Sequence, residues 1–151
     1  MPKVKVYLAA DHRGFALKEY LKEVLLRFGY EAIDMGAYAE VPEDDYPDIV
    51  TPAAQQVAND PGSFGIFICY SGHGEAIAAN RVPGVRAAVF YGGPGEILTL
   101  ARTDNNANVL TLGARFLTQE EATTAVSLFL STSFSNAERH IRRILKIDGH
   151  A

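Results

Sequence analysis

The sequence predicts one α/β domain over residues 1–151: a doubly wound, Rossmann-like, five-stranded parallel sheet with helices on both faces. Short apolar segments alternate strictly with longer segments whose apolar residues recur at helical spacing. The run FGIFICY, residues 64–70, is apolar on both faces, which is typical of strands that helices cover on two sides. No repeat, linker or low-complexity tract divides the chain. Together these observations indicate a parallel sheet in a single domain.

The strands are predicted from short apolar runs, which cover residues 4–10, 30–36, 64–70, 85–91 and 107–113. The helices are predicted from the amphipathic segments between and after them, which cover residues 16–29, 46–60, 75–80, 94–105, 118–132 and 135–147. The first helix ends on Gly29, a natural helix stop, and the second begins near Asp45 or Tyr46.

The composition excludes several classes of protein. The formal charge of −4 argues against general nucleic-acid binding, which needs a broad basic face. The single cysteine cannot form an internal disulfide, and no apolar stretch reaches the ~20 residues of a membrane span. The amino terminus lacks the layout of a signal peptide. We therefore expect a cytoplasmic protein without nucleic-acid or membrane partners.

The predicted fold also indicates where a ligand binds. In doubly wound folds, ligands bind beyond the carboxyl ends of the strands. Four short segments take that place in the predicted sheet: residues 11–12, 69–75, 91–94 and 113–115. We expect the chemistry of the protein to lie among them.

The loop after the third strand, CYSGHGE, holds the thiol of Cys69, the hydroxyl of Ser71, the imidazole of His73 and the carboxylate of Glu75. It lacks the third glycine of a dinucleotide-binding fingerprint, since Ile77 stands in that place, and no Gly-Lys-Ser/Thr phosphate loop occurs. The remaining functional interpretation is an oxyanion cradle, in which backbone N–H groups stabilise negative charge on a substrate. The alternative is a tight strand-to-helix turn that binds nothing.

Each side chain of this loop also has a structural interpretation. A lone cysteine such as Cys69 at the end of a buried strand is more often a small hydrophobe than a nucleophile. Glu75 in the first turn of a helix could complement the helix dipole, and Ser71 could cap the helix. Glu75 also lies beside two glycines at the carboxyl edge of the sheet, where ligands bind in this fold. This position supports a functional role as much as the structural one.

A second candidate site lies in the last predicted helix, where Arg139, Arg143 and Lys146 follow helical spacing. This pattern fits either a solvated basic face near the carboxyl end of a helix or a phosphate clamp. Basic residues clustered in an acidic protein favour the clamp modestly.

A metal site is not expected. The four histidines lie on separate segments without ligand-type spacing, at His12, His73, His140 and His150.

Five segments resemble the ribose-5-phosphate isomerase B and galactose-6-phosphate isomerase family, in the same order along nearly the whole chain: AADHRGFALK, DDYPDIV, GSFGIFICYSGHGEAIAANRVPGVRAA, NNANVLTLGAR and RHIRRI. The resemblance implies an aldose–ketose isomerase of the pentose phosphate pathway that needs no cofactor. The expected reaction is ribose 5-phosphate to ribulose 5-phosphate, through a cis-enediolate. It also implies a homodimer in which each pocket is shared between two subunits. Two such dimers could pair into a tetramer.

The resemblance assigns roles to residues by position. Asp11 would handle a substrate hydroxyl and His12 would assist phosphate binding. The anion-stabilising loop and its substrate contacts would comprise Tyr70, Ser71, Gly72, His73 and Gly74. The phosphate would be held by Arg139 and Arg143. The last helix is expected to extend to the partner subunit, and Asp104, Asn105 and Arg115 are expected to serve the neighbouring subunit's pocket.

The family uses one of two bases, a cysteine at position 69 or a glutamate at position 75, and this chain has both. An unperturbed glutamate, with a pKa of ~4.3, is ionised at neutral pH, whereas an unperturbed thiol at ~8.5 is mostly protonated. The cysteine branch also usually has glycine where Tyr70 stands. We therefore predict Glu75 as the catalytic base, with Cys69 lining the pocket.

One position departs from the family pattern, because Asp104 stands where the resemblance implies a ring-opening histidine. Asp104 could act on the anomeric hydroxyl alone, or another group such as His73 could supply the acid. Alternatively, the substrate is supplied open-chain, as a tetrose phosphate would be. An ordinary pentose-phosphate isomerase with a tolerated substitution remains the first expectation. The competing class is a sugar-phosphate-binding protein or a non-catalytic subunit of a heteromeric isomerase.

Overall fold

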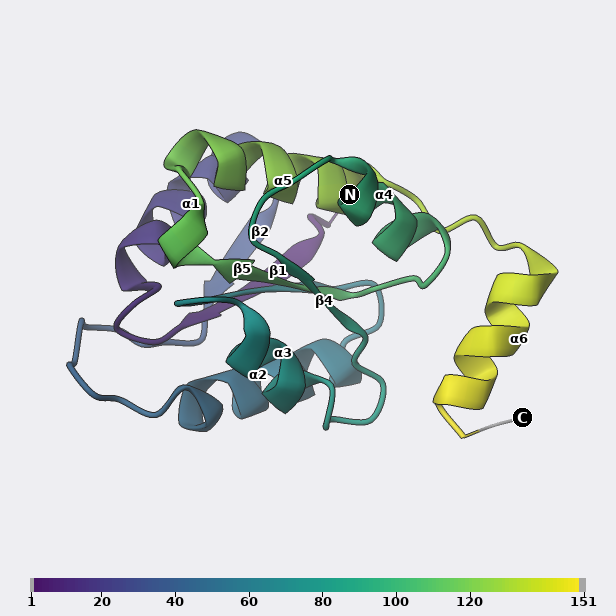
Figure 1. The fold of residues 1–151 in the computed structure, drawn as a ribbon, viewed down its shortest axis with the longest axis horizontal. Coiled ribbons are helices and arrows are strands. Elements are labelled where there is room, and N and C mark those ends of the chain that lie inside the picture. The colour runs from purple at the N-terminus through teal and green to yellow at the C-terminus, as the bar shows by residue number, and fades with distance from the viewer. Residues whose placement is uncertain (1, 150–151) are drawn as a thin grey trace.

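The computed structural model describes residues 2–149, so His150 and the two end residues of the predicted domain lie outside the described part. It confirms the predicted fold class: five parallel strands form one sheet in the order β2-β1-β3-β5-β4 (Figure 1). The strands are β1 (Lys5–Ala10), β2 (Glu31–Asp34), β3 (Phe64–Cys69), β4 (Ala87–Phe90) and β5 (Val109–Gly113). The α-helices are α1 (Phe15–Arg27), α2 (Tyr46–Asn59), α3 (His73–Ala79), α4 (Glu96–Thr103), α5 (Gln119–Ser131) and α6 (Glu138–Ile147), with a 3-10 turn at Ala114–Phe116.

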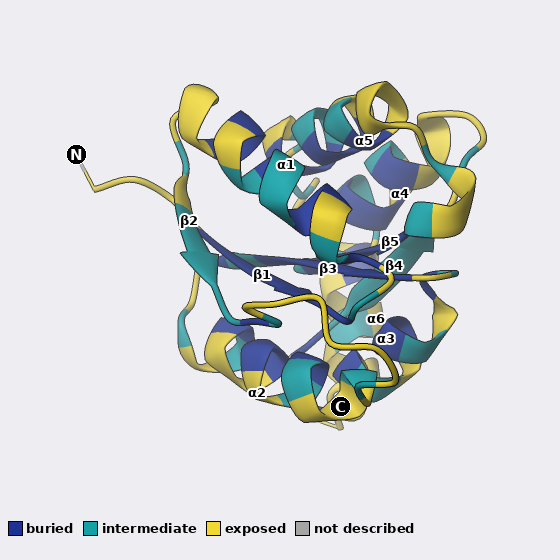
Figure 2. Ribbon diagram, turned by 90° about the vertical axis from the view of Figure 1, so that its left-hand side faces the viewer, coloured by how far each residue is buried: buried dark blue, intermediate teal, exposed yellow. Residues whose placement is uncertain are grey.

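Helices cover both faces of the sheet, with α1, α4 and α5 on one side and α2 and α3 on the other (Figure 2). The strands alternate between the two cores. In β1, Val6 and Leu8 pack against the first group of helices, whereas Tyr7 and Ala9 pack against the second. Both faces of β1 are therefore buried, which explains why its sequence reads as a continuous apolar run.

The strand order creates a switch point between β1 and β3. The chain runs from β1 outward to β2 and then crosses back to place β3 on the other side of β1. The register pairs Ala10 with Ile68, so that Asp11 and Cys69 follow side by side at the carboxyl edge. Gly14, just before α1, packs so closely on β3 that an added Cβ would overlap the carbonyl of Ile68. Loops that diverge from such a point leave room for a ligand.

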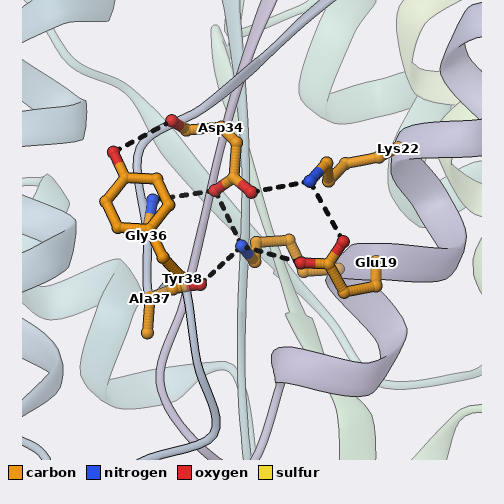
Figure 3. Close-up of polar contacts among 7 residues, drawn as sticks. Glu19, Lys22, Asp34, Gly36, Ala37 and Tyr38 are labelled. Atoms are coloured by element: carbon orange, nitrogen blue, oxygen red, sulfur yellow. Dashed lines mark hydrogen bonds and ion pairs between the residues drawn. The ribbon is translucent and has the colours of Figure 1, made fainter.

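A buried lysine anchors the chain that leaves β2. Lys18 is fully buried, and its Nζ donates to Asp34 Oδ1 at 2.7 Å and to the carbonyl of Ala37 at 2.6 Å (Figure 3). Burial alone would raise the pKa of Asp34, but hydrogen bonds from Lys18, Lys22 and the Gly36 N–H outweigh it and hold this pKa below its ordinary value. The anchored segment continues into the loop that reaches the carboxyl edge of the sheet.

The helix α6 stands apart from the rest of the chain, at the end of the molecule opposite the loop between β2 and α2 (Figure 1). Two side-chain contacts join it to the body: His140 Nε2 lies 3.8 Å from Asp104 Oδ1, and Asp148 forms an ion pair with Arg86 at 3.9 Å. Residues 135–137, predicted as helical, precede the helix in extended or turn conformation. Within residues 2–149, no helix is long and apolar enough to cross a membrane.

Candidate active site

A pocket of about 620 Å³ lies at the carboxyl ends of β1 and β3. Three segments line it: residues 11–13 after β1, residues 44–48 at the start of α2, and the loop after β3 from Cys69 to Glu75. The first and third segments are two of the four predicted from the fold. The pocket therefore lies at the switch point, where the fold class places ligands.

Glu75 is the most unusual group in this pocket. It has no exposed surface, and neither carboxylate oxygen has a hydrogen-bond partner among the described residues. Burial raises its pKa to about 7, and the neighbouring backbone and Cys69 thiol offset only part of that effect. A carboxylate with this pKa can take up and release a proton near neutral pH.

The thiol of Cys69 lies beside Glu75 and is almost completely buried. Burial raises the pKa of this thiol far above its ordinary value, and the negative charges of Glu75 and Asp11 raise it further. The thiolate is the reactive form of cysteine. Cys69 is therefore protonated at neutral pH and poorly suited to act as a base.

Glycines let the loop after β3 turn tightly against its neighbours. Gly72 is the cap residue of α3, and its φ of 92° is a backbone conformation that residues other than glycine rarely adopt. The helix begins at His73, two residues earlier than predicted. An added Cβ on Gly74 would lie 2.6 Å from the ring of Tyr46. Ser71 Oγ accepts a bond from the N–H of His73 at 3.3 Å, but Gly72 holds the cap position of α3 and no side chain caps this helix, so the capping role considered for Ser71 is wrong. No backbone acceptor is found among residues 2–149 for the N–H groups of Gly74 and Glu75.

Asp11 and His12 are held rigidly at the other side of the pocket. Asp11 Oδ1 accepts the backbone N–H groups of Arg13 and Gly14 at 2.9 and 3.1 Å. His12 Nδ1 lies 2.6 Å from Asp44 Oδ1, which also accepts the His12 N–H at 3.1 Å. Polar atoms of Asp11, His12 and Asp44 lie within 4.8 Å of one another, a grouping that the sequence analysis did not foresee. The His12–Asp44 hydrogen bonds account for this closeness.

The sequence analysis missed six residues that line the pocket: Arg13, Asp44, Asp45, Tyr46, Pro47 and Asp48. The guanidinium of Arg13 stacks on the ring of Tyr70, 4.3 Å from its centroid. Asp44 and Tyr46 come from the DDYP segment, which was noted for its resemblance but given no role. Its acidic and aromatic residues directly before a helix were the available signal, but the path that brings them to His12 depends on tertiary structure.

Several predicted site residues do not line the pocket of their own chain. Asp104 and Asn105 follow α4, whereas the pocket lies at the carboxyl ends of β1 and β3. Arg139 and Arg143 are exposed on α6. His73 is also exposed, and its ring packs edge-on against Tyr91, with centroids 5.2 Å apart. Arg115 is exposed in the 3-10 turn after β5, and its backbone N–H donates a hydrogen bond to the carbonyl of Tyr70.

The lining of the pocket is strongly acidic. Its carboxylates are Asp11, Asp44, Asp45, Asp48 and Glu75, and the basic side chains among its lining residues are those of Arg13 and His12. Because a sugar phosphate carries about two negative charges at neutral pH, these two side chains alone are a poor match for it. The pocket of one chain thus holds the acid–base groups without a complete phosphate site.

Comparisons with known proteins agree with this geometry. A family model described as Ribose/Galactose Isomerase matches residues 6–147. Ribose-5-phosphate isomerase B of Mycobacterium tuberculosis is 44% identical over 144 residues, which cover 95% of this chain and 88% of the relative.

Solved structures of two further relatives superpose closely. The ribose 5-phosphate isomerase of Thermotoga maritima has a TM-score of 0.89 at 44% identity and covers 97% of this chain and 98% of its own. The ribose-5-phosphate isomerase B of Mycoplasma genitalium, solved with bound ribulose 5-phosphate, has a TM-score of 0.92 at 37% identity and covers 99% and 97%. The sequence, the fold and the pocket at the switch point thus agree that the chain belongs to the ribose/galactose isomerase family.

Proposed function

We propose that this chain interconverts ribose 5-phosphate and ribulose 5-phosphate by proton transfer through a cis-enediolate, without a cofactor. The observation that carries the proposal is the buried, unpaired carboxylate of Glu75 in the pocket. The names of the relatives support the substrate, and the bound ribulose 5-phosphate of the Mycoplasma genitalium structure supports the product. The cytoplasmic location expected from the sequence stays a prediction.

Glu75 acts as the base in this mechanism. Its carboxylate removes the proton from C2 of the open-chain aldose, a C1–C2 double bond forms, and O1 takes the negative charge. Return of that proton to C1, with movement of the O2 proton to O1, gives the ketose. The N–H groups of the loop around Gly74 stabilise the enediolate oxygens, and Asp11 and Ser71 contact the substrate hydroxyls.

The phosphate site is completed by a second copy of the chain. The acidic pocket needs further cations, and Arg139 and Arg143 lie one helical turn apart on α6, exposed and away from their own pocket. Arginine pairs with phosphate through forked donors. We assign these two side chains, together with Arg115, to the phosphate in the partner's pocket.

The surface of α6 supports this assignment. Ile141 and Leu145 are 40% and 43% exposed on the same helix that carries the arginines. An apolar helix face that its own chain leaves uncovered is typical of a helix buried in an assembly. A homodimer would cover this face and bring the arginines to the acidic pocket. Pairing of dimers into tetramers stays a prediction.

The first prediction concerns the base. Glu75→Gln should lower kcat for ribose 5-phosphate by about 1,000-fold or more, because the amide cannot accept the C2 proton. Cys69→Ala should keep activity within about fivefold of the unmodified enzyme, since the protonated thiol only lines the pocket. Steady-state kinetics of both variants, with melting temperatures as a check on folding, decide the assignment. Loss of turnover in Cys69→Ala with turnover kept in Glu75→Gln would assign the base to the cysteine.

The second prediction concerns the shared pocket. Glu75→Gln and Arg143→Ala chains should each be inactive as homodimers. Mixed and allowed to exchange subunits, they should recover roughly one quarter of the activity, because half the dimers are heterodimers with one intact site. The measurement is the activity of the mixture against the mean of the separate variants. No recovery despite proven subunit exchange would show that each chain uses its own arginines.

The third prediction concerns the substrate. Asp104 in place of the ring-opening histidine keeps a tetrose phosphate as the second candidate, since a tetrose 4-phosphate cannot close through its esterified oxygen. Purified homomeric protein should show a kcat/KM for ribose 5-phosphate at least about tenfold above that for erythrose 4-phosphate. The reverse preference would favour the tetrose. Binding of both without turnover, restored by a second gene product, would indicate a subunit of a heteromeric isomerase.

A further inference from the structure

Arg13 is a cation of the pocket to which the proposed mechanism gives no role. Its guanidinium carbon lies 4.3 Å from the centroid of the Tyr70 ring, so the two groups form a cation–π contact. Arg13 follows β1 and Tyr70 follows β3, and these two neighbouring strands bring them together at the carboxyl edge of the sheet. Both residues line the same pocket as Glu75. The contact is therefore part of the wall of the candidate active site.

The backbone at Arg13 is fixed as well. The carboxylate of Asp11, a residue that is 6% exposed, accepts the N–H groups of Arg13 and Gly14 at 2.9 and 3.1 Å. Gly14 in turn packs against the carbonyl of Ile68. The side chain of Arg13 thus starts from a rigid turn, and the ring of Tyr70 restrains its far end. Such restraint lowers the entropy that is lost when a ligand binds.

The hydrogen-bonding edge of this guanidinium is free. Stacking uses the flat face, whereas the N–H donors point outward in the plane of the group. Among residues 2–149, no hydrogen bond or ion pair is found for the Arg13 side chain, although five carboxylates line its pocket. Arg102 shows the contrast, because it donates to the carbonyls of Thr132 and Ala107 and to the amide oxygen of Asn106. Arg13 is restrained in position and yet keeps its donors for a ligand.

Arg13 and Glu75 lie at different depths of the pocket. Glu75 has no exposed surface, whereas Arg13 is exposed. The largest effects on the pKa of Glu75 come from burial, the backbone, Cys69 and Asp11, none of which is a cation. A sugar phosphate whose C1 and C2 react at the buried carboxylate carries its phosphate at the other end of the molecule. That end must therefore point toward the exposed part of the pocket, where Arg13 lies.

We propose that Arg13 is an own-chain contact of the substrate phosphate, and that Tyr70 is a positioning residue that aims its guanidinium. The inference rests on the proposed function and adds to it a cation from the chain that supplies the base. Arginine pairs with phosphate through two parallel N–H donors, and a guanidinium stacked on an aromatic ring keeps this edge available. Each phosphate then lies between Arg13 of one chain and the α6 arginines of the other.

Arg13→Gln should raise KM for ribose 5-phosphate by about tenfold or more and keep kcat within about threefold, because the lost contact holds the phosphate and not the reacting carbons. The inhibition constant of inorganic phosphate, a competitor that lacks the sugar, should rise by a similar factor. Arg27→Gln is the matched control, since it removes the same charge from an exposed position in the last turn of α1. It should leave all three constants unchanged.

Substitutions of Tyr70 test the positioning. Tyr70→Leu removes the aromatic face and should raise KM and the inhibition constant of inorganic phosphate by about three- to fivefold, with kcat kept within about threefold. Tyr70→Phe retains the aromatic face and should recover most of this loss. Adding Tyr70→Leu to Arg13→Gln should cost less than about a further twofold, because the ring acts through the guanidinium.

Subunit mixing tests whether Arg13 serves the pocket of its own chain. Glu75→Gln mixed with Arg13→Gln should stay at the mean activity of the separate variants, measured at substrate concentrations well below the wild-type KM. Each site of that heterodimer carries one of the two changes, unlike the heterodimer of Glu75→Gln and Arg143→Ala, in which one site is intact. Recovery of activity in the Arg13→Gln mixture would place Arg13 at the partner's substrate and overturn the assignment.

The inference is also overturned if folded Arg13→Gln leaves KM and the phosphate inhibition constant unchanged, or if it lowers kcat alone. Arg27→Gln shifting these constants as much as Arg13→Gln would attribute the effect to net charge and would equally overturn it. A wild type that does not turn over ribose 5-phosphate would instead refute the proposed function. Melting temperatures of all variants confirm that they are folded.

Discussion

The burial of the Glu75 carboxylate without a partner is the constraint on which the rest of the site depends. An ionisable group in this position costs folding free energy, because water no longer solvates its charged form. Glu75 lies in the first turn of α3, shortly after the central strand β3, and this places it at the switch point; among residues 2–149 no group hydrogen-bonds to its carboxylate oxygens. The same burial brings the pKa to about 7, where a carboxylate both accepts and returns a proton efficiently.

This constraint also bears on the division of labour that we propose between two chains. A pocket lined by five carboxylates suits a base and hydroxyl contacts, but its potential opposes a phosphate. Placing Arg139 and Arg143 on α6, away from their own Glu75, separates the cations from the base within one chain, and dimer formation would reunite them across the interface. Guanidiniums packed directly beside Glu75 would instead stabilise its charged form and lower its pKa.

The fold and part of the site followed from local sequence pattern, because doubly buried strands and glycine-bounded loops leave clear signals. The loop from Cys69 to Glu75 could be placed at the ligand edge for that reason. The contact of Asp44 with His12 could not, since it depends on Lys18 and Asp34 anchoring a loop that carries no periodicity. The proximity of His140 to Asp104 was equally invisible, because Asp104 follows α4 and His140 lies on α6, with all of β5 and α5 between them in the sequence. The start of α3 was misjudged because Gly72, rather than a polar side chain, occupies its cap position.

The most direct test of the central claim compares the stability of the wild type and Glu75→Gln across pH. Because the pKa of Glu75 is raised from 4.5 to about 7 on folding, the folded state binds this proton more tightly than the unfolded state. The wild type should therefore lose stability relative to the variant as pH rises from about 5 to about 8, and Glu75→Gln should be the more stable protein at the upper end. Chemical unfolding at each pH measures this difference. A difference that does not change with pH, or one that grows in favour of the wild type as pH rises, would mean that this carboxylate is neither buried nor unpaired in solution.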